Sequence, residues 1–252
     1  MQQNRGFSLI EMAFVLVIIT LLLGGLLVPF ATQVEQRRIA ETQKAMEEIK
    51  EALIGYALSH SSTGTPSQPY LPCPDTNGDG TEETRDGSGN CPNPGLAEGE
   101  LPWVTLGTAP TDAWGNRFHY QVTKGFANSV TGFGLASPAG DITICNMAPS
   151  AGCALSNRLA TSIPAVVLSY GKNGYGALNG NTPATVLPQK PSRNPIAAAG
   201  LDETANLDAA DAIFVSRIIT GPGAGLQEFD DLVIWLSPNV LYNRMVSAGR
   251  LP

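Results

Sequence analysis

The densest group of oxygen ligands in this sequence lies between residues 71 and 100, where seven carboxylates stand against a single arginine. From residue 75, oxygen-bearing side chains recur at alternate positions and a glycine occupies the sixth place, as in an EF-hand calcium loop. The ligand positions are Asp75, Asn77, Asp79, Thr81, Glu83 and Asp86. Because calcium is a hard cation that takes oxygen ligands, this pattern predicts an isolated calcium-binding loop.

An acidic, solvated turn is the alternative to a calcium loop. The helices that flank an EF-hand loop are missing, since Pro72 and Pro74 precede the segment and Gly87-Ser88-Gly89 follows it. Calcium as a cofactor is therefore an expectation that depends on the loop alone.

Four cysteines bracket two segments of the chain. The calcium-loop candidate lies between Cys73 and Cys91, and a shorter segment lies between Cys145 and Cys153. Of the three possible pairings, the simplest forms two local disulfides, Cys73–Cys91 and Cys145–Cys153. Zinc is the competing use of four thiols, but the spacing lacks a C-x₂-C pair, and an extracytoplasmic location favours oxidation.

Patterns of catalysis and of nucleic-acid binding are missing from the sequence. It has no G-x-S-x-G, H-E-x-x-H or P-loop motif, and its two histidines, His60 and His119, lie in no nucleophile or metal pattern. A formal charge of −7 with 15 Lys and Arg argues against phosphate binding. We expect neither an enzyme nor a partner of nucleic acid.

The chain that must position these candidate residues divides into two parts of different composition. Residues 7–28 hold one charge, Glu11, in 22 residues, long enough to cross ~30 Å of hydrocarbon as a helix. Arg5 in front biases the N-terminus toward the cytoplasm. A cleaved secretory signal fits poorly because the apolar stretch is too long. A carboxylate at membrane depth costs about 2.5 kcal/mol or more, which marks Glu11 as a functional candidate.

Residues 29–60 predict a second, amphipathic half of the same helix, locally opened at Pro29. Met46, Ile49, Leu53 and Tyr56 recur at spacings of three, four and three, which makes one apolar stripe that needs a partner surface. Most of the 27 Gly and 19 Pro follow residue 60. Residues 61–252 are therefore expected to form a β-rich, loop-rich domain, with strands at 165–170, 212–220 and 232–236.

The segment Gly6-Phe7-Ser8-Leu9-Ile10-Glu11 resembles the prepilin processing signature of type IV pilin-like proteins. The resemblance implies that prepilin peptidase cuts between Gly6 and Phe7, which removes a leader of residues 1–6, and that Phe7 is then methylated. It also implies that Glu11 pairs with the N-terminal amine of a neighbouring subunit during assembly. The implied fold is α+β, a long N-terminal helix packed on a β-rich globular domain.

A second segment, residues 112–120, is similar to the Asp-x-Trp-Gly-x-Pro-Tyr-x-Tyr stretch of major type II secretion pseudopilins, which lies in a calcium-stabilised region of their sheet. Arg117 stands where that family has proline. Many type IV pilins close with a disulfide near the C-terminus, whereas no cysteine follows Cys153 here. The similarity at residues 112–120 and the missing C-terminal cysteine both favour the secretion branch of the family.

These resemblances lead us to expect a structural subunit of a type II secretion pseudopilus. It would lie in the bacterial inner membrane as a single-pass protein with a periplasmic domain. The expected partners are copies of itself or other pseudopilins, prepilin peptidase, the inner-membrane assembly platform and membrane lipid. The alternatives are a minor pilin of a type IV pilus and, in another class, a membrane-anchored extracytoplasmic binding protein.

Overall fold

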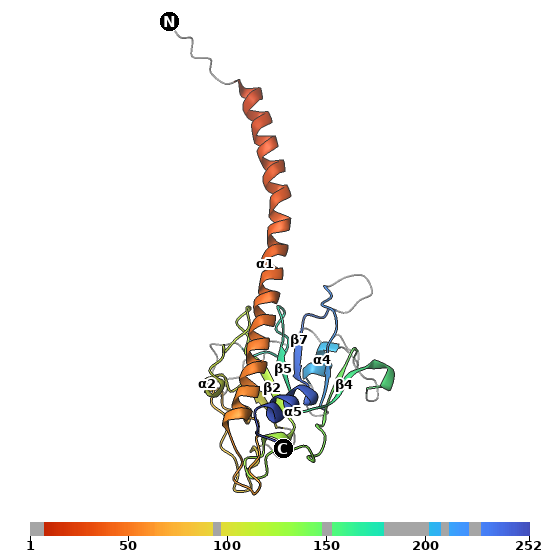
Figure 1. Ribbon diagram of the computed structural model, residues 1–252. Helices are drawn as coiled ribbons and strands as arrows, with labels where there is room; N and C mark the ends of the chain where they lie inside the picture. The colour runs from red at the N-terminus through yellow and green to blue at the C-terminus, as the bar shows by residue number, and fades with distance from the viewer. Residues whose placement is uncertain (1–7, 93–96, 148–152, 179–201, 208–211, 222–227) are drawn as a thin grey trace. The chain divides into compact units, whose positions relative to one another are not determined.

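The computed structural model describes residues 8–92, 97–147, 153–178, 202–207, 212–221 and 228–252, and for residues 22–30 it describes the backbone alone. The chain divides into two compact units, Met1–Glu41 and Thr42–Pro252. The long helix α1 (Leu9–Ser59) contributes to both units (Figure 1). The local opening predicted at Pro29 does not interrupt α1, which runs as one α-helix from Leu9 to Ser59.

The first unit consists of the N-terminal part of α1, and its apolar side chains are exposed. Leu9, Phe14 and Leu21 expose 93%, 64% and 72% of their surface. Among the described residues, no helix combines the length and the apolar character that crossing a membrane requires. Phe7 and the side chains of residues 22–28, which belong to the predicted span, lie outside the described part.

The second unit contains a four-stranded antiparallel sheet in the order β1-β2-β5-β7. Its strands are β1 (Ala97–Glu100), β2 (His119–Val122), β5 (Ala165–Ser169) and β7 (Leu232–Leu236). β5 is buried along its whole length, as its run of β-branched and aliphatic residues predicts. The segments predicted as strands at 165–170 and 232–236 are confirmed.

A three-stranded sheet follows the order β4-β3-β6, with β3 antiparallel to β4 and parallel to β6. Its strands are β3 (Ile142–Cys145), β4 (Arg158–Ile163) and β6 (Ile213–Val215). The remaining described elements are α2 (Trp103–Leu106), α3 (Lys124–Ala127), η1 (Leu155–Asn157), α4 (Asp202–Leu207) and α5 (Pro238–Ser247). β6 is shorter than the strand expected over residues 212–220.

One hydrophobic core lies between the four-stranded sheet and the C-terminal half of α1. The predicted stripe of Met46, Ile49, Leu53 and Tyr56 is buried. Its first three residues pack with sheet residues such as Tyr120 of β2, and Leu241 and Met245 of α5 join the same cluster. Burying each large apolar side chain contributes roughly 1.5–3 kcal/mol, so this stripe holds the end of α1 to the sheet.

A second core covers the opposite face of the four-stranded sheet. Because side chains alternate along a strand, Val166 and Leu168 of β5 point away from α1. They pack against Ile142 and Ile144 of β3 and Phe214 of β6. The fold is therefore α+β as expected, with a helix on one face of the main sheet and a smaller sheet on the other.

Candidate functional site

The predicted calcium loop is organised around the buried carboxylate of Asp75. Its Oδ1 accepts hydrogen bonds from the N–H groups of Asn77 (3.1 Å) and Gly78 (2.6 Å), and its Oδ2 accepts one from Gly80 N–H (2.7 Å). Gly78 and Gly80 have φ angles of 82° and 84°, in the left-handed region that favours glycine. Asp75 and these glycines therefore build the turn themselves.

The other predicted ligands also bond within the loop. Asn77 Oδ1 accepts from Asp79 N–H (2.9 Å), Asp79 Oδ1 from Thr81 N–H (2.7 Å), and Glu83 Oε1 from the Thr76 hydroxyl (2.7 Å). Asp86 turns toward the N–H groups of Ser88 and Asn90.

The exposed carboxylates of this loop are held in their charged form by these contacts. Hydrogen bonds from Thr81 lower the pKa of Asp79, and hydrogen bonds from Asn90 lower that of Asp86. Each of these hydrogen bonds closes a local turn, and they do not bring the carboxylates together at one point. Calcium binding by this loop stays a prediction.

A disulfide and the contacts of Glu82 and Arg85 hold the loop in place. The Cys73–Cys91 disulfide closes it, which is the predicted pairing. Glu82 bonds to the Tyr56 hydroxyl of α1 (2.6 Å) and forms an ion pair with Arg85 (2.8 Å). Arg85 also donates to the carbonyls of Leu71 and Ala127. The single arginine of the acidic segment thus ties the loop to the domain, a role that the sequence did not indicate.

The second predicted disulfide, Cys145–Cys153, is also present. It joins the end of β3 to the chain just before β4. The Arg158 side chain bonds to the Cys153 carbonyl (2.9 Å) beside it. All four cysteines are therefore in disulfides.

The motif at residues 112–117 holds a turn against the end of β5. Asp112 Oδ1 accepts from the N–H groups of Trp114 and Asn116 (2.9 Å each), and Oδ2 accepts from the Ser169 hydroxyl (2.7 Å). Asn116 Nδ2 donates to the Gly171 carbonyl (2.9 Å). In this chain the motif therefore serves as a structural connection.

Arg117, which replaces proline in that motif, links the turn to the calcium-loop candidate. Its guanidinium donates to the Gly78 carbonyl (2.8 Å) and lies 4.3 Å from the centre of the Trp103 ring. Nearby, burial raises the pKa of Glu100 to about 8 and lowers that of His119 to about 4. In both side chains burial favours the uncharged form, which avoids the cost of burying ions.

A cluster of three carboxylates appears at a place that the sequence did not predict. Glu203 of α4 and the pair Asp230 and Asp231 before β7 each offer an oxygen within 4.8 Å of the others. Asp231 is 3% exposed, and its Oδ2 accepts from Asn206 Nδ2 (2.8 Å). The Oδ1 atoms of Asp230 and Asp231 are buried without a hydrogen-bond partner. Burial raises the pKa of both aspartates.

Among the described residues, this is the one cluster of three or more Asp, Glu, His or Cys side chains whose possible ligand atoms converge. Sequence reasoning missed it because Glu203 lies 27 residues from Asp230. The adjacent acidic pair at 230–231, ahead of an apolar strand, was the signal available in the sequence.

The predicted processing residues, Gly6 and Phe7, lie outside the described residues. Glu11 is described, and it forms a capping box with Ser8 at the start of α1. Ser8 N–H donates to Glu11 Oε2 (2.9 Å), and Glu11 N–H donates to Ser8 Oγ (3.3 Å). The carboxylate therefore satisfies a free N–H group of the helix terminus while it stays exposed.

Comparison with known proteins gives one finding at this N-terminus and none elsewhere. Residues 1–27 match the family model described as the prokaryotic N-terminal methylation motif. No curated protein matches the chain. No solved structure matches it either. The N-terminal 27 residues thus carry the prokaryotic N-terminal methylation motif, the signal characteristic of type IV pilins and pseudopilins.

Proposed function

We propose that this chain is a structural subunit of a type II secretion pseudopilus in the bacterial inner membrane. The methylation motif carries the proposal, because it implies processing by prepilin peptidase and assembly into filaments. A motif of this kind indicates a structural protein rather than an enzyme. Processing falls between Gly6 and Phe7, and the mature N-terminal helices of neighbouring subunits then pack together.

The physical support lies in the first turns of α1. Apolar side chains there are exposed in the isolated chain, so their burial in lipid or against other helices is favourable. Glu11 is a carboxylate in an otherwise apolar run, and it needs a partner wherever water is excluded. The ammonium group of a processed neighbour supplies that partner, because pairing reduces the cost of burying both ions.

Two observations favour the secretion branch of the proposal over a minor pilin of a type IV pilus. The motif at residues 112–117 resembles that of major pseudopilins and connects Asp112 to Ser169. Both disulfides lie before residue 154, with none near the C-terminus.

Imaging filaments with an antibody against this chain separates a repeating subunit from one found at an end, and export assays in a deletion strain identify the system. A membrane-anchored binding protein would join no filament.

Replacing Gly6 with alanine tests processing directly. We expect the wild-type chain to lose residues 1–6 and gain a methyl group on Phe7, and Gly6→Ala to retain the leader. Intact-mass spectrometry of the protein from membranes measures both changes. Gly24→Ala makes the same substitution inside the apolar helix and should leave processing unchanged. A wild-type chain that keeps residues 1–6 in a cell with active prepilin peptidase would contradict the proposal.

We further propose that the domain binds a divalent cation, with calcium favoured by an all-oxygen ligand set. The observation that supports it is the convergence of Glu203, Asp230 and Asp231, where two buried carboxylate oxygens lack hydrogen bonds. Three carboxylates so close repel each other unless protons or a cation neutralise them. The loop of residues 75–86 is the competing place for the same ion.

A thermal shift experiment distinguishes the two places. At calcium concentrations about 100 times Kd, binding stabilises the folded state by about 2.7 kcal/mol. For a chain of this size that raises the Tm of the full-length protein in detergent by roughly 5–10 °C. Asp231→Asn should remove the shift, whereas Asp79→Asn with Asp86→Asn should retain it. The reverse pattern assigns the ion to the loop, and no shift in the wild type contradicts cation binding.

A further inference from the structure

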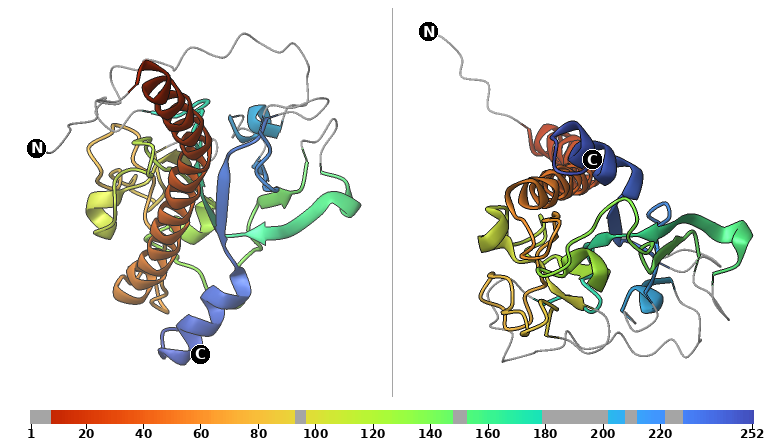
Figure 2. Two further views of the ribbon diagram at one scale, coloured as in Figure 1. Left: turned by 90° about the horizontal axis from the view of Figure 1, so that it is seen from above. Right: turned by 60° about the horizontal axis from the view of Figure 1, so that its bottom comes forward.

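The short helix α4 depends on contacts with the strands and turns around it. It has six residues, Asp202–Leu207, and a helix of that length is not stable by itself in water. Leu207 packs against the second core, and Gly176 leaves room for it, because a Cβ atom at that position would collide with Leu207 Cδ2. In Figure 1 and in the left view of Figure 2, β7 lies between α4 and the part of α1 that belongs to this unit.

Asn206 joins α4 to β6 and to the residue that precedes β7. It is 1% exposed, and its Oδ1 accepts a hydrogen bond from Val215 N–H of β6 (2.6 Å). Its Nδ2 donates to the Val215 carbonyl (3.1 Å) and to Asp231 Oδ2 (2.8 Å). An asparagine Nδ2 carries two hydrogens, so both are used. Asn206 therefore fixes the orientation of the Asp231 carboxylate.

Asn173 orients the other two carboxylates of the cluster. Its Nδ2 donates to Glu203 Oε1 (2.9 Å), and its N–H donates to Asp230 Oδ2 (2.7 Å). Glu203 Oε1 also accepts from Asp230 N–H (3.1 Å). Each carboxylate of the cluster thus has one oxygen that a protein donor holds. The remaining oxygens of Asp230 and Asp231 are buried without a hydrogen-bond partner, as oxygens that bind an ion would be.

The packing of α4 brings a third carboxylate to a buried acidic pair. The possible ligand atoms of Glu203, Asp230 and Asp231 lie within 4.8 Å of one another. Charges of one sign repel at this distance, and removal from water strengthens the repulsion. A divalent cation among them reverses the effect, because each carboxylate is then attracted to the ion. Since the ion gains Glu203 only when α4 is in place, binding of the ion and packing of α4 favour each other.

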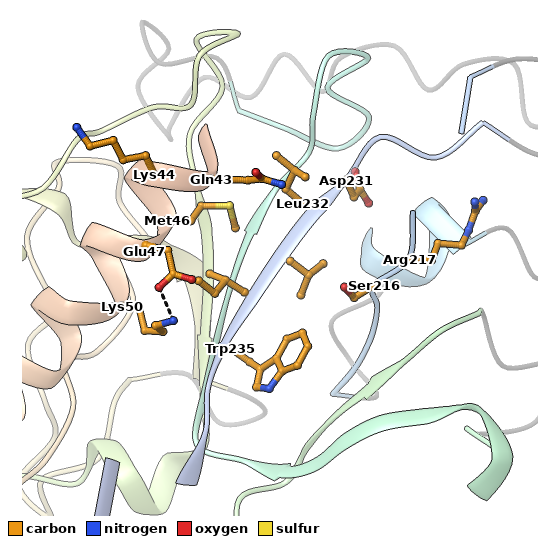
Figure 3. Close-up of a pocket in the computed structure, with 12 residues that line it drawn as sticks. Gln43, Lys44, Met46, Glu47, Lys50, Ser216, Arg217, Asp231, Leu232 and Trp235 are labelled. Atoms are coloured by element: carbon orange, nitrogen blue, oxygen red, sulfur yellow. Dashed lines mark ion pairs between the residues drawn. The ribbon is translucent and has the colours of Figure 1, made fainter. Parts of the chain in front are cut away.

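The cluster lies beside a groove through which an ion can approach it. The groove has a volume of about 700 Å³ and runs along β7, and Asp231 and Arg217 are among the residues that line it (Figure 3). Arg217 is already paired with Asp202 and donates to the Thr220 hydroxyl (2.8 Å). None of the three carboxylates forms an ion pair with a described residue. The described side chains therefore leave their charge to be balanced from outside.

We propose that a divalent cation bound by Glu203, Asp230 and Asp231 holds α4 against β6 and the start of β7, with Asn173 and Asn206 as the positioning residues of its ligands. This inference rests on the cation binding proposed above and adds what the ion controls. Without the ion, repulsion among the carboxylates favours release of α4. With the ion, α4 and the two strands are joined at one point.

Two backbone amides report the packing of α4 directly. The N–H groups of Val215 and Asp230 donate to side chains of α4, so each exchanges with solvent when α4 is released. Calcium at about 100 times Kd should slow their exchange by roughly a hundredfold relative to a chelator, because the ion stabilises the packed state by that factor. Hydrogen-exchange mass spectrometry of the full-length protein in detergent measures it. The Gly80 N–H, which Asp75 holds in the acidic loop, should not respond.

Alanine variants of the two asparagines test the positioning roles. Asn206→Ala and Asn173→Ala each remove an amide that orients a ligand carboxylate and leave the ligands in place, so calcium affinity should fall about tenfold or more. Asn128→Ala removes a buried asparagine with four hydrogen bonds beside the acidic loop and should leave the affinity unchanged. Isothermal titration of the full-length proteins with calcium measures all three. Asn173 is half-buried, so its variant carries the test if Asn206→Ala does not fold.

The outcomes separate this inference from the cation binding on which it rests. If calcium raises the Tm of the wild type while the Val215 and Asp230 amides do not respond, cation binding stands and the link to α4 is wrong. A response of the Gly80 amide in their place assigns the ion to the acidic loop and also overturns the inference. Equal calcium affinity in the wild type and in both asparagine variants overturns the positioning roles. If neither the Tm nor any of these amides responds, cation binding fails together with this inference.

Discussion

Glu11→Leu is expected to abolish incorporation of the chain into filaments while the protein still inserts into the membrane and folds. Leucine removes a carboxylate from an apolar run, so insertion becomes more favourable. It also leaves the N-terminal ammonium of a neighbour without its partner. Breaking one side of a buried ion pair costs about 3–5 kcal/mol, which corresponds to a loss of affinity on the order of a hundredfold or more. Quantifying the chain in sheared filaments against the membrane fraction measures the effect.

The capping box at the start of α1 requires two control variants. Ser8→Ala removes the hydroxyl that accepts from Glu11 N–H, so it tests the cap without changing charge. Glu11→Gln keeps an oxygen that can accept from Ser8 N–H and removes the charge. If pairing between subunits is the role of Glu11, the glutamine variant fails to assemble and Ser8→Ala assembles. Normal filaments from Glu11→Leu would rule out the pairing.

Removing the Cys73–Cys91 disulfide is expected to lower the free energy of unfolding of the domain by more than removing the Cys145–Cys153 disulfide. The two cysteines are 18 residues apart, and in the chain-entropy model closing such a loop stabilises the fold by about 3 kcal/mol. The double variant Cys73→Ala, Cys91→Ala also frees the segment that carries the Glu82 contact with Tyr56. A loss of this size lowers the Tm by roughly 6–12 °C for a chain of this length. Urea unfolding of the full-length protein measures the loss in free energy of unfolding, and a thermal melt measures the change in Tm.

The second disulfide provides the matched comparison. Cys145 and Cys153 are 8 residues apart, so Cys145→Ala with Cys153→Ala should cost less, by about 0.7 kcal/mol in the same model. Reducing agent should lower the stability of the wild type toward that of the variants. An unfolding midpoint unchanged by loss of Cys73–Cys91 would show that the hydrogen bonds of Asp75 and the ion pair of Arg85 hold the loop unaided.

Local patterns explain why much of the fold could be predicted. The stripe of Met46, Ile49, Leu53 and Tyr56 depends on helical periodicity alone, and all four residues are buried. The apolar run of β7 matches its predicted bounds, Leu232 to Leu236. β6 was predicted too long because the segment 212–220 has strand composition throughout, whereas only Ile213–Val215 pairs with β3, and Thr220 forms an isolated bridge with Phe229 instead. Pairing is a tertiary property that composition does not contain.

The candidate sites were predictable to different degrees. The N-terminal motif is contiguous, and its match to residues 1–27 needs no folding. The acidic loop is contiguous as well, but the roles of Glu82 and Arg85 depend on Tyr56 and on the carbonyls of Leu71 and Ala127, which the fold brings near. Arg85, which in the sequence is only a positive charge among carboxylates, therefore connects the loop to the rest of the domain, because its neighbours in space differ from its neighbours along the chain.

The sequence by itself determined the features whose information is local: the methylation motif, the amphipathic stripe of α1 and the pairing of nearby cysteines. Only the tertiary structure brought Glu203 to Asp230 and Asp231 and left the edge of β7 beside α1 without a partner strand in the described part of the chain. These features join residues that lie tens to nearly two hundred positions apart, and their proximity depends on sheet order and on the packing of two cores. Periodicity and spacing along a chain carry no record of that order, because it is decided by the burial of surfaces that meet only in the folded state.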